Sequence, residues 1–473
     1  MPDHPRAAGD RGGACIPQRV WARSPPLAGP PLPLGELGDS VWSLCCCDLC
    51  GAEPLFVYRL KARFMATTQS TSWEKNFASS VEVIKGSAIR ELLKLTEQPE
   101  VISFAGGLPA PACFPVEEMA VAAEQVMANG AVRALQYGPT EGFPPLREFL
   151  ASLMAKRGVP IRPSQVLITS GSQQSLDIVA KLMVDRDDVV LVEDPTYLGA
   201  LQAFRPYQPR FVVLPMDDDG LIPAELEKAL ASLAAEGRRA KFLYTVSSFQ
   251  NPTGVTLSRE RREALLDIAE RHGLPIVEDD PYGELRYSGE PVPPLAALDF
   301  QRHGAPRTVL YFSTFSKLLA PSLRVGWIVG PDAMLQKIVL VKQGIDLHTG
   351  TLVQAIAYES CKDGLLDRHI PVIRSIYHDR RDAMLGALEQ HMPEGVRWTR
   401  PEGGMFLWLT VPDHVNMKAL FMRAVELKVA FVAGTDFYAN GSAANTMRLN
   451  FSHPDREHII LGVQRLAAAI REQ

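Results

Sequence analysis

The residue best suited to chemistry in this sequence is Lys317, which is flanked by hydroxyl side chains within the apolar stretch Phe312–Arg324. A lysine with apolar neighbours and a nearby cation has a depressed pKa and can form a Schiff base. Arg324 carries the planar guanidinium that binds a phosphate through two hydrogen bonds. The alternative is a surface lysine whose stem packs on apolar side chains.

Three further segments follow strand-like runs. Thr169–Ser175 places a glycine turn and hydroxyls before a helix, which suits phosphate, or Ser172 simply caps that helix. In Ser248–Gly254, Asn251 either donates to a ligand oxygen or only builds a turn. In Ile276–Tyr282, one of three consecutive carboxylates could pair with a cationic ring nitrogen, or all three could mark a charged strand exit. An imine-forming lysine, a phosphate cradle, a ring-oxygen donor and an acid for a pyridinium together predict pyridoxal phosphate.

These segments require a scaffold that brings strand ends together. Short β-branched or aromatic runs alternate with helical stretches such as Ser172–Val184, Ile222–Glu236 and Ser258–His272. This alternation predicts an α/β fold with a mostly parallel, doubly wound sheet, in which ligands bind beyond the carboxyl ends of the strands. The predicted strands are Val166–Thr169, Val189–Glu193, Arg210–Leu214, Phe242–Val246, Pro275–Asp279, Val309–Ser313 and Val325–Val329.

The last part of the chain has a different pattern. A long helix over about Ile373–Gln390 precedes strands at Gly404–Thr410 and Met447–Phe451, with a helix at Asn416–Leu427 between them. This order predicts a smaller α+β domain. We expect a disordered extension over 1–64, an arm and part of the small domain over 65–115, a large cofactor domain over 116–345, and an interdomain helix with the small domain over 346–473.

The composition is that of a soluble globular protein: 473 residues, 46% hydrophobic and 22% charged, with a formal charge of −5. This charge favours neither nucleic acid nor an anionic membrane as a partner, and apolar runs stay short of a membrane span. Residues 1–64 hold nine of the 37 prolines and five of the seven cysteines. The cluster Cys45–Cys50 lacks a second ligand pair, so we expect no metal site, and few cysteines elsewhere favour a cytoplasmic location. The extension has no signal-peptide pattern and could reflect a mis-assigned start.

From about Trp73 to Arg471 the chain resembles the fold-type I, class I/II aminotransferases that depend on pyridoxal phosphate, and within them the multi-substrate 2-aminoadipate aminotransferase subgroup. Seven strings in the family's order carry the resemblance: Ser103–Pro111, Leu135–Gly142, Thr169–Gln174, Ser248–Gly254, Val277–Tyr282, Thr314–Lys317 and Thr446–Asn450.

The resemblance implies a role for each matching residue. Lys317 forms the Schiff base and moves the proton, Asp279 pairs with the pyridine nitrogen, and Tyr197 stacks on the ring. Arg448 binds the substrate α-carboxylate, and Gly107 lines the substrate. The residues implied at the ring oxygen are Asn251 and Tyr282; those implied at the phosphate are Ser172, Gln173, Thr314, Ser316, Arg324 and, from a neighbouring subunit, Tyr137.

The expected reaction is ping-pong transfer of an amino group from an L-amino acid to 2-oxoglutarate, in a homodimer with shared sites. The resemblance implies 2-aminoadipate, glutamate, aromatic or branched-chain donors. Arg90 is expected either to bind a side-chain carboxylate from a mobile helix or to pair with a nearby glutamate. Two other functions stay open. An aminotransferase-like sensor of a transcription regulator would need a DNA-binding head that residues 1–64 lack, and the same fold also supports β-lyases.

Overall fold

The computed structural model describes residues 73–84, 100–441 and 445–473. Contacts divide the chain into two units, 1–76 and 77–473. In the first unit the described part is a 3-10 turn over Trp73–Asn76. The second unit holds all the elements below, whereas the expectations for residues 1–64 and for Arg90 fall outside the described residues.

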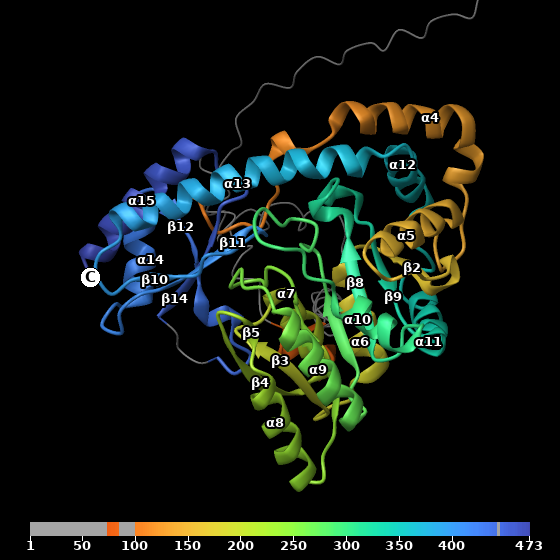
Figure 1. The fold of residues 1–473 in the computed structure, drawn as a ribbon, viewed down its shortest axis with the longest axis horizontal. Coiled ribbons are helices and arrows are strands. Elements are labelled where there is room, and N and C mark those ends of the chain that lie inside the picture. Colours follow the sequence, from red (N-terminus) through yellow and green to blue (C-terminus); the bar gives the residue numbers. More distant parts are fainter. Residues whose placement is uncertain (1–72, 85–99, 442–444) are drawn as a thin grey trace, which may run out of the picture. The chain divides into compact units, whose positions relative to one another are not determined.

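The centre of the second unit is a sheet of eight strands within the described residues, in the order β2-β9-β8-β7-β6-β3-β4-β5 (Figure 1). Strands β3, β4, β6, β7 and β8 pair in parallel, whereas β9 and β5 run antiparallel to their neighbours. The mostly parallel sheet is therefore confirmed. The bounds are β2 Val166–Thr169, β3 Val189–Asp194, β4 Arg210–Asp217, β5 Gly220–Leu221, β6 Ala240–Thr245, β7 Ile276–Asp279, β8 Val309–Thr314 and β9 Gly326–Val329.

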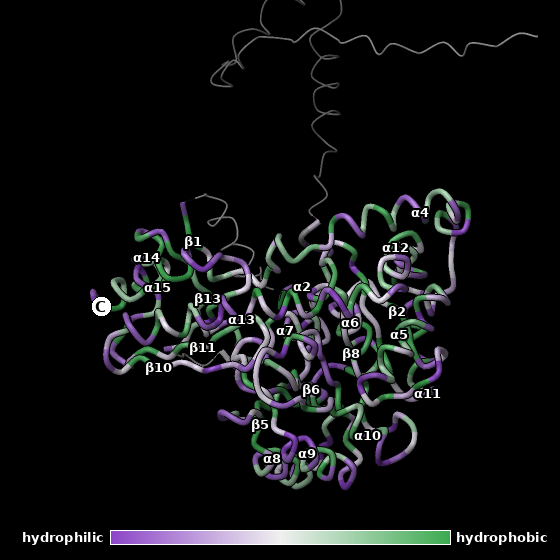
Figure 2. Tube along the Cα trace, turned by 45° about the horizontal axis from the view of Figure 1, so that its top comes forward, coloured by the Kyte–Doolittle hydropathy of each residue, from purple (hydrophilic) through white to green (hydrophobic). Residues whose placement is uncertain are grey.

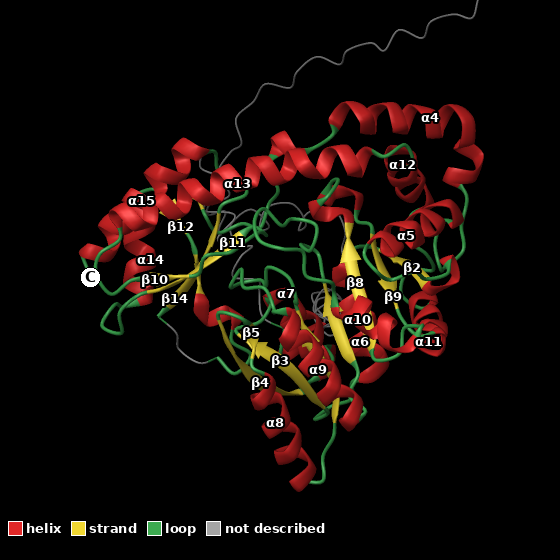
Figure 3. Ribbon diagram, in the orientation of Figure 1, coloured by secondary structure: helices red, strands yellow, loops and turns green. Residues whose placement is uncertain are grey.

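Helices pack against this sheet, among them α5, α6, α8 and α10 (Figure 3). Every residue of β2, β7, β8 and β9 is buried, which is typical of strands covered on both faces. The α-helices described up to residue 361 are α2 Ser79–Glu82, α4 Val116–Leu135, α5 Pro144–Lys156, α6 Ser172–Met183, α7 Leu198–Phe204, α8 Pro223–Ala235, α9 Arg259–His272, α10 Leu295–His303, α11 Asp332–Gln343 and α12 Thr351–Cys361.

A second sheet of four antiparallel strands, in the order β10-β11-β14-β13, is built from the C-terminal part of the chain. Beside it β1, which comes early in the sequence, pairs in parallel with β12. The bounds are β1 Ile102–Ser103, β10 Arg397–Trp398, β11 Phe406–Thr410, β12 Val429–Ala430, β13 Val432–Ala433 and β14 Thr446–Asn450, with helices α13 Leu365–His391, α14 Met417–Glu426 and α15 Arg456–Arg471.

Helix α13 joins the two sheet regions, since it packs on α12 at one end of its path and on α15 along the other (Figure 1). Its 27 residues give a length of about 40 Å. In Figure 2, hydrophilic and hydrophobic segments alternate along α4, which packs on α12 with one face and leaves apolar side chains exposed on another. No helix in the described part of the chain is long and apolar enough to cross a bilayer.

Candidate active site

A pocket of about 470 Å³ lies where the ends of β7 and β8 approach β11 and β14 of the smaller sheet. The structure brings twelve of the fourteen residues singled out in the sequence into its lining. These twelve are Gly107, Ser172, Gln173, Tyr197, Asn251, Asp279, Tyr282, Thr314, Ser316, Lys317, Arg324 and Arg448. Tyr137 is 79% exposed and does not line this pocket, and Arg90 falls outside the described residues.

Lys317 follows β8, at the end of a single 3-10 turn over Phe315–Lys317. Thr314 holds this turn, since its hydroxyl accepts a hydrogen bond from the Ser316 N–H at 3.1 Å. The Lys317 Nζ donates to the backbone oxygen of Gly107 at 2.8 Å. Burial lowers the pKa of the Lys317 amine to about 8, and the positive charges of Arg448 and Arg324 act in the same direction. The amine is therefore far more available as a nucleophile than that of an exposed lysine.

Asp279 ends β7 and is 2% exposed. Its Oδ2 accepts a hydrogen bond from the hydroxyl of Tyr244 at 3.0 Å, whereas its Oδ1 has no partner among the described residues. Burial raises the pKa of the carboxyl to about 7, although the Tyr244 hydroxyl acts in the opposite direction. A buried acceptor without a donor is costly, so this oxygen fits a cationic N–H such as that of a pyridinium ring.

The start of α6 offers a cradle for an anion. Gly171 precedes the helix with φ +85°, and a Cβ at this position would lie 2.6 Å from Nη2 of Arg324. A glycine is therefore required both for the turn and for the approach of the guanidinium. The hydroxyls of Thr314 and Ser316 lie 2.9 Å apart in the same lining. Backbone N–H groups of a helix start, hydroxyls and an arginine make up a phosphate site.

A buried hydrogen-bond network that the sequence analysis missed stabilises the turn before α6. Lys342 of α11 is fully buried and donates to Gln174 Oε1, to both oxygens of Asp346 and to Thr349. Gln174 Oε1 also accepts the backbone N–H of Ser170 at 2.8 Å. The only sequence signal for this network was a lysine within the apolar run of α11.

Arg448 lies on β14 and is 1% exposed, with Phe406 of the neighbouring strand β11 under its guanidinium at 4.3 Å. Its Nη1 donates to Asn251 Oδ1 at 2.9 Å and its Nη2 donates to the backbone oxygen of Ala105 at 2.7 Å. The Nε has no partner among the described residues. Burial lowers the pKa of the guanidinium to about 10. The free N–H and the planar fork suit a carboxylate.

Two pairs of interacting side chains also line the pocket. Asn251 donates from Nδ2 to the hydroxyl of Tyr282 at 3.3 Å. The Tyr197 hydroxyl lies 3.5 Å from Gln173 Oε1, and Gln173 Nε2 donates to the backbone oxygen of Gly199 at 2.7 Å. A Cβ at Gly199 would lie 2.4 Å from the Tyr197 ring, so glycine leaves the space for that ring. The lining therefore includes the aromatic ring of Tyr197 and the hydrogen-bonded amide and phenol of Asn251 and Tyr282.

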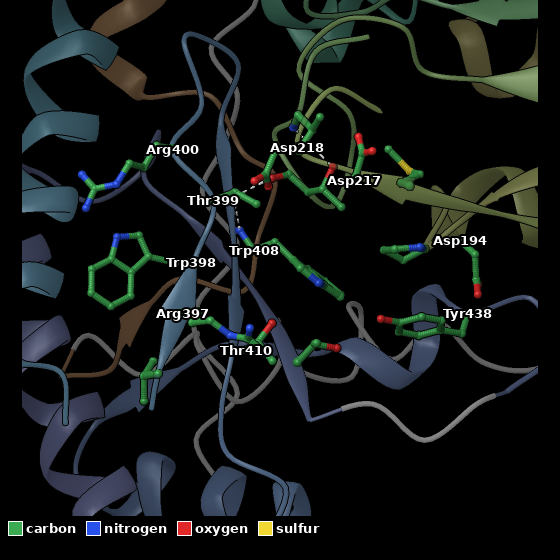
Figure 4. A pocket seen from close by; sticks show the side chains of 16 residues that line it. Asp194, Asp217, Asp218, Arg397, Trp398, Thr399, Arg400, Trp408, Thr410 and Tyr438 are labelled. Carbon is green, nitrogen blue, oxygen red and sulfur yellow. Dashed lines mark hydrogen bonds between the residues drawn. The ribbon is translucent and has the colours of Figure 1, made fainter. Parts of the chain in front are cut away.

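Figure 4 shows a second pocket, of about 670 Å³. Asp217 and Asp218 line it together with Arg397, Trp398 and Arg400. Thr399 closes part of it, because its hydroxyl donates to the backbone oxygen of Thr253 at 2.7 Å. No lysine is among the described residues that line it, whereas Lys317 lines the first pocket.

A mostly parallel sheet with a half-buried lysine, a buried acid that keeps one oxygen without a donor, and an anion cradle defines the class of fold-type I enzymes that use pyridoxal phosphate. Residues 101–466 match the model of the family "Aminotransferase class I and II". The chain belongs to this family and is a pyridoxal-phosphate-dependent aminotransferase.

Individual relatives agree with the family. Aromatic-amino-acid aminotransferase 1 of Thermococcus litoralis is 48% identical, over 88% of this chain and 98% of that protein. The 2-aminoadipate transaminase of Thermus thermophilus is 44% identical, over 85% and 98%. The crystal structure of a Thermus thermophilus α-aminoadipate aminotransferase, complexed with N-(5'-phosphopyridoxyl)-L-leucine, matches with TM-score 0.78 and 43% identity, over 85% and 98%.

Proposed function

We propose that this aminotransferase moves the amino group of an L-amino acid to 2-oxoglutarate by a ping-pong mechanism, with Lys317 as the covalent anchor and the proton carrier. The observation that carries the proposal is one pocket that holds a depressed-pKa lysine, an unpaired acid oxygen and a buried arginine.

Each residue has one task in this proposal. Bound pyridoxal phosphate supplies the electron sink that stabilises negative charge at the substrate Cα. Lys317 Nζ removes the proton from Cα and returns one to the cofactor side. The Asp279 carboxylate holds the proton on the ring nitrogen, and Arg448 orients the α-carboxylate. Tyr197 covers the ring face and keeps water away from it.

The other lining residues hold the cofactor. Asn251 and Tyr282 already form a hydrogen-bonded pair, which is in place to donate to a phenolic oxygen. Gly107 lines the substrate side, where its backbone oxygen accepts from Lys317. The proposed phosphate ligands are Ser172, Gln173, Thr314, Ser316 and Arg324.

The proposed donors are 2-aminoadipate, glutamate, and aromatic or branched-chain amino acids. Support comes from the printed names of the relatives, which include aromatic amino acids and 2-aminoadipate, and from a structure that carries a phosphopyridoxyl-leucine adduct. A single buried arginine, Arg448, serves the α-carboxylate that all these donors share. We assign the second carboxylate of acidic donors to Arg90.

We further propose a homodimer with shared sites. Val132, Leu135 and Tyr137 are 87%, 65% and 79% exposed at the end of α4 and just beyond it, which is unusual for large apolar side chains on one segment. Tyr137 is thereby free to serve a neighbouring subunit's phosphate. A cytoplasmic location is supported by Cys113 and Cys361, which are free and buried.

The domain boundaries at residues 115 and 345 belong to the same proposal. The pairing of β1 with β12, and the hydrogen bond from the Asn450 N–H to the backbone oxygen of Phe104, support a small domain that uses both ends of the chain.

The proposal is tested by Lys317→Ala. Borohydride treatment of the loaded enzyme should fix the cofactor on the peptide that contains Lys317, as read by mass spectrometry. We expect Lys317→Ala to lose this label and about 10⁴-fold in transamination rate. The control Lys337→Ala changes an exposed lysine of α11 and should keep both. A label on another lysine, or turnover retained in Lys317→Ala, contradicts the proposal.

Substrate choice is tested with a panel of donors, each with 2-oxoglutarate as acceptor. Arg90→Ala should lower kcat/KM for glutamate and 2-aminoadipate at least tenfold more than for leucine, because one charge-assisted contact is worth about 1.5–3 kcal/mol. Equal losses for all three donors would remove Arg90 from side-chain recognition. Release of pyruvate and ammonia, measured beside the 2-oxo acid, separates lyase activity from transfer.

A further inference from the structure

The hydroxyl group nearest to the charge of Asp279 comes from inside the sheet. Tyr244 is a residue of β6 with 0% exposure, and its hydroxyl donates to Oδ2 of Asp279 at 3.0 Å. Tyr244 does not line the pocket and has no part in the roles assigned above.

The register of the sheet explains why these two side chains meet. Strands β6 and β7 pair in parallel, with Tyr244 opposite Val277. Asp279 is two residues beyond Val277, so it projects from the same face of the sheet as Tyr244. A shift of one residue in either strand would turn the hydroxyl away from the carboxylate.

This hydrogen bond makes the two oxygens of the Asp279 carboxylate inequivalent. Oδ2 is occupied by Tyr244, and Oδ1 is the one without a donor among the described residues. A carboxylate with one oxygen fixed has a fixed plane, since rotation about its terminal bond would break the hydrogen bond. The open oxygen then has one direction in which to accept.

The environment of Tyr244 keeps its hydroxyl protonated and therefore able to donate a hydrogen bond. Burial and the negative charge of Asp279 raise the pKa of Tyr244 well above its usual value, so the phenol stays protonated wherever the enzyme works. Donation to Oδ2 also favours the ionised carboxylate over its neutral form. The pair therefore offers a negative, oriented acceptor at the buried end of β7.

We propose that Tyr244 is a positioning residue for the cofactor, which holds Asp279 by Oδ2 so that Oδ1 meets the pyridine nitrogen. This inference rests on the proposed role of Asp279. It adds to the site a residue that contacts neither substrate nor cofactor and acts through the acid alone.

The test compares two ligands of the cofactor-free protein: pyridoxal phosphate and its analogue with C–H in place of the ring nitrogen. Tyr244→Phe should reduce the preference for pyridoxal phosphate over the analogue about tenfold, because only the ring nitrogen uses Asp279. Equal weakening of both ligands would show a merely structural role and overturn the proposal.

The matched control is Tyr311→Phe. Tyr311 lies on β8, the neighbour of β7 on the side opposite β6, and is as buried as Tyr244. Its hydroxyl donates at 3.2 Å to Asp280, the residue after Asp279. This variant should leave the preference unchanged. Asp279→Asn should abolish the preference. A preference retained in Asp279→Asn contradicts the proposed role of Asp279, whereas a preference lost there but unchanged in Tyr244→Phe contradicts only the role of Tyr244.

A variant-free measurement keeps the inference testable if Tyr244→Phe does not fold. In a crystal structure of the unmodified enzyme with its cofactor, we expect the ring nitrogen nearest to Oδ1 and the Tyr244 hydroxyl on Oδ2. The opposite assignment of the two oxygens, or a Tyr244 hydroxyl beyond hydrogen-bond distance of both, overturns the proposal.

Discussion

Lys317 and Arg448 share the pocket, and the charge of Arg448 lowers the pKa of the Lys317 amine. Lys317 has a pKa of about 8 because burial and the charges of Arg448 and Arg324 oppose its protonation. The guanidinium of Arg448 stays protonated at the same pH, since even its lowered pKa is about 10. The pocket therefore lets the Lys317 amine lose its proton near pH 8, while the guanidinium of Arg448 keeps its charge.

This separation predicts a pH dependence. The neutral amine is the reactive form, so attachment of pyridoxal phosphate to the cofactor-free protein should accelerate as pH rises and level off above about 8. The measurement is the rate of the absorbance change after rapid mixing, over a pH range of about 6 to 10. Arg448→Gln removes a positive neighbour and should move the midpoint upward. A midpoint near 10.5 in the unmodified protein would contradict this account.

The sequence predicted residue types better than it predicted their supporting contacts. Twelve predicted residues line one pocket because most of them belong to short strings at or just after the end of a strand. Tyr244 and Lys342 were missed, because a tyrosine or a lysine in an apolar run is indistinguishable from ordinary core packing. Their partners, Asp279 and Asp346, are set by strand register and helix placement, which no local pattern contains.

At the level of elements, the turn before α6 depends on a helix far along the chain. Lys342 of α11 is fully buried, and Asp346, whose side chain is 25% exposed, accepts from it at 2.9 Å. Gln174 connects this ion pair to the backbone N–H of Ser170. The turn proposed to bind phosphate is therefore stabilised by tertiary contacts as well as by the helix start.

Removal of one partner should expose this dependence. Asp346→Ala leaves a charge without its partner in the core and should lower the free energy of unfolding by about 3 kcal/mol. Denaturant unfolding of the cofactor-free protein measures it. The control Asp379→Ala removes the exposed pair with Arg456 and should cost less than about 1 kcal/mol. Similar losses in the two variants would mean that the buried network contributes little.

The elements themselves were largely predictable. Strand β2 has the bounds expected from its β-branched run, and the seven predicted strands of the large sheet are all present. Helix α13 begins at Leu365, ahead of the expected start at Ile373. Pro371 lies inside the helix, which continues through it because Leu365, Leu366 and Ile370 are buried in the core. Tertiary packing here outweighed a local signal.

For the whole molecule, the order of strands in the large sheet was not predictable, since two neighbouring pairs, β2 with β9 and β6 with β3, are not consecutive in sequence. Strand β2 neighbours β9 across most of the domain's length. The pattern of alternation indicated parallel pairing, but not which strands pair. The exposed apolar side chains of α4 likewise become visible only once its other face is packed on α12.

That exposed row carries a prediction about assembly. Val132→Asp should raise the dissociation constant of the dimer about 100-fold, because a charge at a covered apolar position must be desolvated. Sedimentation equilibrium measures it. Met422→Asp, which introduces the same charge at an exposed position of α14 (58% exposed), should leave assembly unchanged. A protein that sediments as a monomer before any substitution contradicts the proposed dimer.

One short loop ties down both cations of the pocket. The Lys317 ammonium donates to the backbone oxygen of Gly107, and the Arg448 guanidinium donates to that of Ala105. A molecule that binds both Lys317 and Arg448 competes with the backbone oxygens of Gly107 and Ala105 for the same N–H donors. Loading the pocket would therefore replace both of these contacts of segment 105–107 by contacts to the bound group.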